Sequence, residues 1–250
     1  MTVARTTPRL IDRGDLLAAL DRASARKVTI ISAPAGSGKT SLLRAWADRL
    51  DRAHRLAVVR VRRDQHDAQD FWLALLAAVR HGSGAEPPAA TPDFNAPAMV
   101  DRVLSELAGS RGDITLVIDD LHELNSRETL AQLTRLLTNL PPGAHAVLTT
   151  RHDLRLGLHQ LRLAGELAEI RAADLRFTER DTRELLAASG IALSEADATL
   201  LHQRTEGWAA GLRLAVLSLA GHPDPERFVA EFSGTNRAVA EYLIGEMLDR

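Results

Sequence analysis

Short apolar runs alternate with segments of helical apolar spacing over the first two thirds of the chain. Continuous apolar or β-branched runs predict strands, and amphipathic segments predict helices. The predicted strands are Val28–Ile31, Leu56–Val61, Ile114–Ile118, Ala146–Thr149 and Leu167–Ile170. The predicted helices begin at Leu42 and cover Asp70–Arg80, Met99–Leu107 and Ser126–Leu140. Because the two kinds of segment alternate, we expect an α/β fold with a mostly parallel five-stranded sheet.

The pattern becomes purely helical after residue 172. Thr178 and Ser194 each stand three residues before an aspartate, a spacing close to that of a capping box. Helical segments follow at 207–220, 225–232 and 235–249. We therefore expect a larger domain over residues 1–172 and a smaller all-helical domain over residues 173–250. Since the last helix reaches Arg250 without a stop signal, we expect the chain to be part of a longer protein.

Glycine, proline and alanine dominate residues 81–97, which predicts a long surface loop between two helices. Three tryptophans, Trp46, Trp72 and Trp208, lie within helical apolar patterns, which favours packing in a core. No apolar run approaches the roughly 20 residues of a membrane span. The N-terminus also lacks the apolar region of a signal peptide, so we expect a cytoplasmic protein that does not bind membranes.

The composition narrows the classes of function. A formal net charge of −2 gives no general attraction for nucleic acids, so we expect no direct nucleic-acid binding by this part. The chain has no cysteine, which excludes disulfides, thiolate metal sites and cysteine nucleophiles. Lys27 and Lys39 are its only lysines beside many arginines, so a lysine within a motif is informative.

The strongest chemical motif directly follows the first predicted strand. Residues 33–40 match the phosphate-loop pattern except at Ala33, where the pattern has glycine. Two glycines let backbone N–H groups face an anion at the start of a helix, Lys39 supplies charge for the β- and γ-phosphates, and the Thr40 hydroxyl suits Mg²⁺. We expect ATP or ADP with Mg²⁺. The predicted nucleotide-binding residues are Ala33, Pro34, Ala35, Gly36, Ser37, Gly38, Lys39, Thr40 and Ser41.

An acidic pair ends the third predicted strand. Asp119 can hold Mg²⁺ together with Thr40, and Asp120 can orient an attacking water, although Glu123 could take that role instead. Arg151 follows the fourth strand, where a basic side chain can reach the γ-phosphate. The predicted metal ligands are therefore Thr40 and Asp119, and the predicted catalytic residues are Lys39, Asp119, Asp120 and Arg151.

Four segments in this order resemble the nucleotide-binding region of STAND-class signalling ATPases. They are residues 32–40, 117–122, 149–151 and 205–212, and residues 240–246 also fit. The resemblance is to the branch that holds the maltose-regulon activator and the large ATP-binding LuxR-type regulators. Relatives often carry proline in the fourth segment, where Ala209 and Ala210 stand here, which puts nucleotide contact from this segment in doubt.

The resemblance implies a nucleotide-driven switch with slow ATP hydrolysis. In such proteins inducer and ATP together favour an open, self-associating state, and the ADP form is closed. DNA binding would depend on a C-terminal domain outside this sequence. The resemblance also implies that Leu10 and Arg13 lie beside the adenine.

Other readings stay open from the sequence. A motor or loader ATPase related to AAA+ proteins is the main alternative, although the chain has no obvious arginine-finger motif. The module could also belong to a signalling protein whose effector is a kinase domain. A small-molecule kinase would use the same phosphate loop, but no acceptor site is evident.

Overall fold

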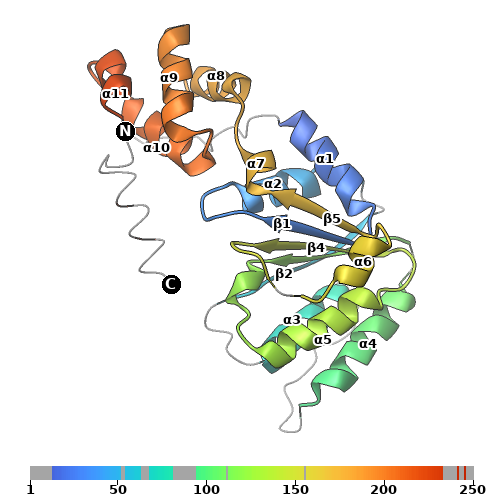
Figure 1. Ribbon diagram of the computed structural model, residues 1–250. Coiled ribbons are helices and arrows are strands. Elements are labelled where there is room, and N and C mark those ends of the chain that lie inside the picture. Colours follow the sequence, from blue (N-terminus) through green and yellow to red (C-terminus); the bar gives the residue numbers. More distant parts are fainter. Residues whose placement is uncertain are drawn as a thin grey trace, which may run out of the picture. The chain divides into compact units, whose positions relative to one another are not determined.

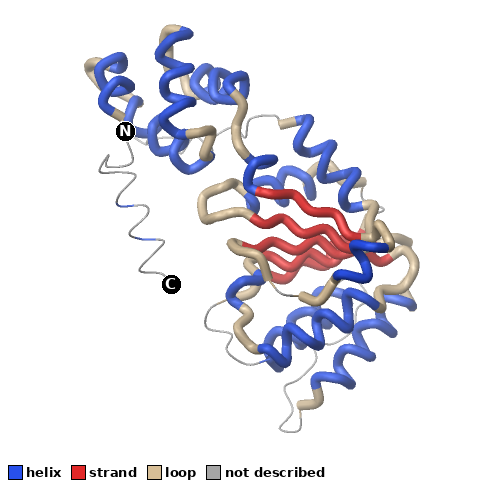
Figure 2. The backbone as a smooth tube through the Cα atoms, viewed as in Figure 1, coloured by secondary structure: helices blue, strands red, loops and turns tan. Residues whose placement is uncertain are grey.

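The computed structural model describes residues 13–51, 54–62, 68–80, 94–110, 112–154 and 156–232, together with residues 241 and 245. These residues belong to two compact units (Figures 1 and 2). Residues 17–34 and 39–171 form an α/β unit, and the described residues of 1–16, 35–38 and 172–250 form a mainly helical unit. Leu10 falls outside the described residues. The same holds for most of the predicted loop at 81–97, and for the last predicted helix and the segment 240–246 except residues 241 and 245.

One sheet organises the α/β unit. Its five strands are all parallel and lie in the order β2-β3-β4-β1-β5. They are β1 (Val28–Ser32), β2 (Arg55–Arg60), β3 (Ile114–Asp119), β4 (Ala144–Thr150) and β5 (Leu167–Arg171). This arrangement confirms the predicted α/β fold. Since parallel strands end at the same edge of a sheet, the segments that follow β1, β3 and β4 share one edge, where ligands bind in such folds.

Helices cover both faces of this sheet, as Figure 1 shows. One face carries α3 (Ala68–Arg80), α4 (Ala96–Ala108) and α5 (Arg127–Thr138), and the opposite face carries α1 (Gly14–Ser24) and α2 (Lys39–Ala47). Leu116, Ile118 and Leu148 belong to the buried core on the side of α3 to α5. On the other face, the Trp46 indole N–H donates to Asp21 Oδ1 at 2.8 Å and joins α2 to α1.

Three helices of the α/β unit correct the sequence prediction. The helices α1 and α6 (His159–Leu163) are absent from that prediction. The helix α4 begins at Ala96, so the loop predicted to run to Pro97 ends earlier. Asn95 is the reason, because its side chain accepts a hydrogen bond from Ala98 N at 3.0 Å and caps the helix. Pro97 then occupies the first turn, where the missing N–H of proline costs no helical hydrogen bond.

The helical unit packs four main helices around its own core. They are α8 (Glu179–Ala188), α9 (Glu195–Thr205), α10 (Ala209–Leu219) and α11 (Pro225–Glu231). Leu185, Leu201, Leu212, Val229 and Phe232 are among its buried side chains.

The caps of these helices follow the predicted pattern in one case and depart from it in the other. Thr178 and Asp181 form a complete capping box before α8, as predicted. At α9, Ser194 accepts a bond from Asp197 N, but the Asp197 carboxylate accepts from the Ser194 hydroxyl, so this box is only half formed. No helix in the described part of the chain is long and apolar enough to cross a membrane.

Candidate nucleotide-binding site

The backbone of the phosphate loop has the conformation that its glycines allow. Gly36 and Gly38 have φ angles of 70° and 89°, in the left-handed region that favours glycine. Ala33, at the position where the pattern has glycine, is buried, and its N–H donates to Thr150 O at 3.2 Å. The backbone of Ala33 is thus bonded to the end of β4. Since α2 begins at Lys39, the loop ends at the positive end of a helix, where anions bind.

Lys39 lies against the backbone of the loop and is only 7% exposed. Its ammonium group donates to the carbonyl oxygens of Ala33 at 2.6 Å and Pro34 at 2.9 Å. A buried ammonium needs such partners, because burying an unpaired charge is costly. A buried cation beside the glycine turn, at a helix start, has the charge and donors that suit a phosphate chain.

Asp119 is the centre of the acidic side of the site. It ends β3, is 5% exposed, and accepts hydrogen bonds from Thr40 Oγ1 at 3.1 Å and from Thr149 Oγ1 at 2.5 Å. The hydroxyl of Thr40 and the carboxylate of Asp119 are hard oxygen ligands, the kind that Mg²⁺ prefers. The structure therefore brings together the two residues predicted as metal ligands.

Asp120 follows in an unusual backbone conformation. Its φ of 58° lies in the left-handed region, which aspartate tolerates better than most residues. Its N–H donates to Thr149 Oγ1 at 3.0 Å, and its carboxylate pairs with Arg60 Nε at 3.0 Å. Thr149 thus holds both members of the acidic pair, by donating to Asp119 and accepting from Asp120. No local sequence pattern indicates this role of Thr149.

His122 lies in the short 3-10 helix η1 (Leu121–Glu123) directly after the acidic pair. Its side chain is 8% exposed, and Nε2 is 3.3 Å from Glu123 Oε1. Neither ring nitrogen has a hydrogen-bond partner among the described residues. Burial lowers the pKa of His122, the charge of Arg151 lowers it further, and the Glu123 carboxylate opposes both. The imidazole is therefore neutral at neutral pH. The positive charge of Arg151 acts on this histidine, which directly follows the acidic pair.

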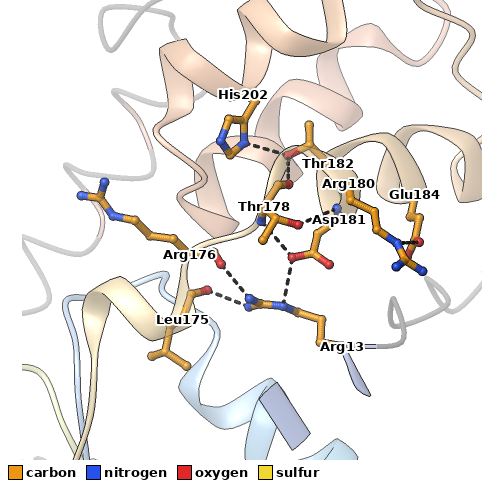
Figure 3. Close-up of polar contacts among 9 residues, drawn as sticks. All are labelled: Arg13, Leu175, Arg176, Thr178, Arg180, Asp181, Thr182, Glu184 and His202. Carbon is orange, nitrogen blue, oxygen red and sulfur yellow. Dashed lines mark hydrogen bonds and ion pairs between the residues drawn. The ribbon is translucent and has the colours of Figure 1, made fainter. Parts of the chain in front are cut away.

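Arg13 is fixed within the helical unit, as Figure 3 shows. Its guanidinium donates to the carbonyl oxygens of Leu175 and Arg176, both at 2.7 Å, and lies 3.6 Å from Asp181 Oδ2. It also stacks over the Phe177 ring, 4.7 Å from the centroid, in a cation–π contact. Burial lowers the pKa of Arg13, and Asp181 opposes the shift. The role of Arg13 beside adenine stays a prediction.

The remaining loop residues divide between the two units. Ala35 and Gly36 belong to the helical unit. Within this unit, Ala35 O accepts a hydrogen bond from Trp208 Nε1, and Gly36 O accepts one from Ala210 N. Ser41 is exposed on α2, and its binding role stays a prediction. Trp208 packs against the helical core as expected, but its bond to the loop is a contact that no local sequence pattern indicated.

Comparison with known families identifies the family of the chain. A family model described as an AAA domain matches residues 21–156, which is more than half of the chain. The chain belongs to the AAA domain family. We call the whole chain the AAA module. It is a P-loop ATPase by fold and motif, as the phosphate loop predicts.

Two curated relatives match nearly all of the AAA module. The serine/threonine-protein kinase PknK of Mycobacterium tuberculosis is 32% identical over 255 residues, covering 97% of this chain and 23% of the relative. The HTH-type transcriptional regulator MalT of Yersinia pestis is 26% identical over 247 residues, covering 95% of this chain and 27% of the relative. The chain thus spans about a quarter of the length of these relatives. The resemblance to the branch of the maltose-regulon activator is supported in this shared region.

Solved structures share the fold of the AAA module. A Walker-type ATPase of Pyrococcus abyssi has a TM-score of 0.61 at 15% identity, with 96% of this chain and 75% of that chain covered. Drosophila ORC bound to DNA has a TM-score of 0.56 at 14% identity, with 96% and 63% covered. At these identities the likeness concerns the fold alone.

Proposed function

We propose that this module is a switch that binds ATP with Mg²⁺, hydrolyses it slowly to ADP and phosphate, and belongs to a signal-responsive regulator of STAND type. The convergence of Lys39, Thr40 and Asp119 carries the proposal, because it joins a cation for phosphates to two oxygen ligands for a metal ion. The names of the two curated relatives, a transcriptional regulator and a protein kinase, support a signalling role. We favour the transcriptional regulator, and a kinase-linked protein is the second candidate.

Each residue of the site has a definite task in this proposal. Lys39 binds the β- and γ-phosphates, and the N–H groups of the glycine loop donate to their oxygens. Thr40 and Asp119 would hold Mg²⁺, which when bound neutralises charge on the phosphates. Asp120 or Glu123 orients the attacking water and accepts its proton, and Arg151 contacts the γ-phosphate and so distinguishes ATP from ADP.

Calorimetric titration with ATP and ADP tests the binding step. Lys39→Ala should weaken binding at least about 100-fold, since it removes a buried charge that faces phosphate. Lys27→Ala is the matched control, because Lys27 pairs with Glu166 at 3.0 Å and not with the loop. If the parent chain bound neither nucleotide, or if Lys39→Ala bound as tightly as Lys27→Ala, the proposal would be wrong.

Turnover and assembly separate the switch from a motor ATPase. A switch should release phosphate slowly, form larger assemblies with ATP than with ADP, and bind no DNA through this part alone. Steady-state phosphate release and sedimentation with each nucleotide measure these properties. Fast turnover in a ring of constant size would favour the motor ATPase instead.

Two variants, Asp120→Asn and Glu123→Gln, identify the base. The base is the residue whose substitution abolishes hydrolysis while ATP binding is retained, provided that the other variant still hydrolyses ATP. A cytoplasmic location stays a prediction from the sequence.

A further inference from the structure

The tip of the phosphate loop is held by the helical unit through two hydrogen bonds. The indole N–H of Trp208 donates to Ala35 O at 3.2 Å, and the backbone N–H of Ala210 donates to Gly36 O at 2.9 Å. Both donors come from the start of α10, and residues 35–38 belong to the same compact unit as α10. Two consecutive carbonyl groups of the loop therefore have fixed partners.

These two bonds also fix the direction of the N–H groups in the loop. In a planar trans peptide, the C=O of one residue and the N–H of the next point in opposite directions. When Ala35 O and Gly36 O bond to α10, the N–H groups of Gly36 and Ser37 must point away from α10. The positive φ of Gly36 then turns successive N–H groups toward a common side, the arrangement that binds an anion.

Gly211 leaves space for the Trp208 indole, and Gly207 lets the backbone directly before Trp208 lie close to Phe177. A Cβ on Gly211 would lie 2.7 Å from Cε3 of Trp208, so any larger residue would displace the ring. A Cβ on Gly207 would lie 2.4 Å from the carbonyl oxygen of Phe177, and Phe177 N in turn donates to Gly207 O at 2.9 Å. Within the segment 207–211, Trp208 is therefore preceded by a glycine that lies close to the Phe177 backbone. It is followed by a glycine that leaves space for its ring.

We propose that Trp208 is a positioning residue for phosphate binding, which with Ala210 N–H orients the anion-binding N–H groups of the loop. The proposal rests on the nucleotide-binding function proposed above and assigns part of it to the helical unit. In this role the indole acts through Ala35 and not through contact with the nucleotide. Emission from Trp208 should therefore change when phosphate occupies the loop.

Trp208→Phe is the first variant, because phenylalanine keeps a ring beside Gly211 and removes the indole N–H. Loss of one hydrogen bond should weaken ATP, ADP and inorganic tripolyphosphate about five- to tenfold, measured by calorimetry. The variant should also lose the change in tryptophan emission on adding ATP. Trp72→Phe is the matched control, because the Trp72 indole N–H has no hydrogen-bond partner among the described residues. It should retain the parental affinity and the emission change.

Ala210→Pro tests the second bond independently. Ala210 lies in the first turn of α10, where proline is tolerated, and the substitution removes only the N–H that holds Gly36 O. It should weaken the same three ligands to a similar degree with unchanged far-UV circular dichroism. If the parent chain binds ATP and both variants bind as tightly as Trp72→Phe, the positioning role is refuted and the proposed function stands. If the parent chain does not bind ATP, both are refuted.

Discussion

The replacement of Gly207 by alanine should destabilise the helical unit strongly. The residue has a φ of 69°, a conformation that costs a residue with a Cβ about 1 kcal/mol or more. The added Cβ would also lie 2.4 Å from the carbonyl oxygen and 3.1 Å from the nitrogen of Phe177. These are backbone atoms that cannot rotate away, and displacement of packed structure adds about 2 kcal/mol. We expect a total loss of about 3 kcal/mol.

Gly190→Ala is the matched control for this loss. Gly190 has a φ of 70° and lies in the same unit, but nothing lies within 4 Å of the position of its Cβ. It should therefore show only the conformational cost, about 1 kcal/mol. The difference of about 2 kcal/mol between the variants isolates the contact with Phe177.

Urea unfolding followed by circular dichroism and tryptophan emission measures the difference. Because two units need not unfold together, the transition of the helical unit is fitted separately. With an m-value of about 1 to 2 kcal/mol/M, the Gly207→Ala midpoint should lie at least about 1 M below that of Gly190→Ala. Equal midpoints would show that the backbone around Phe177 moves away at no cost. The close approach of Gly207 to Phe177 would then not contribute to the loss of stability.

Three further predictions concern single side chains. Thr149→Val removes both hydrogen bonds that hold the acidic pair. It should raise the Mg²⁺ concentration needed for ATP binding about tenfold in calorimetric titrations. An unchanged Mg²⁺ requirement would exclude a positioning role for Thr149. Because the pKa of His122 is lower in the folded state than in the unfolded chain, the unfolded chain takes up a proton first as the pH falls below about 6.5. The contribution of His122 to stability is therefore fully present above that pH and is lost as the pH falls below it. His122→Phe should flatten this fall in urea midpoints measured from pH 7 to 5, and an equal slope would contradict it. Asn95→Ala should cost about 1 kcal/mol, seen as faster hydrogen exchange at the start of α4, and unchanged exchange would deny the cap a role.

The sequence was most informative where the physical signal is local. Each strand shows as an apolar run, and the phosphate loop and Asp119 follow two such runs directly. The helix α1 is absent from the sequence prediction, in which the segment before Lys27 has only its resemblance to a nucleotide-binding segment. The predicted start of α4 is too late because proline is also typical of loops, although Asn95 and Pro97 together are a typical helix start.

The site residues that the sequence did not indicate act across long chain separations. Thr149 bonds to Asp119 because β4 pairs with β3, and the order of strands is not visible in the chain itself. The contact of Trp208 with Ala35 joins residues 173 positions apart. Apolar spacing could indicate that Trp208 packs in a core, but not which carbonyl its indole N–H meets.

The loop contacts of α10 bear on how this protein can be divided into fragments. The family match ends at residue 156 and the sheet ends at Arg171, so either point would suggest itself as the end of an isolated ATPase core. A piece cut there would lack the donors for Ala35 O and Gly36 O, and water would take their place. The loop would then sample more conformations and lose entropy on binding phosphate. We therefore expect a fragment with an ordered loop to extend at least into α10.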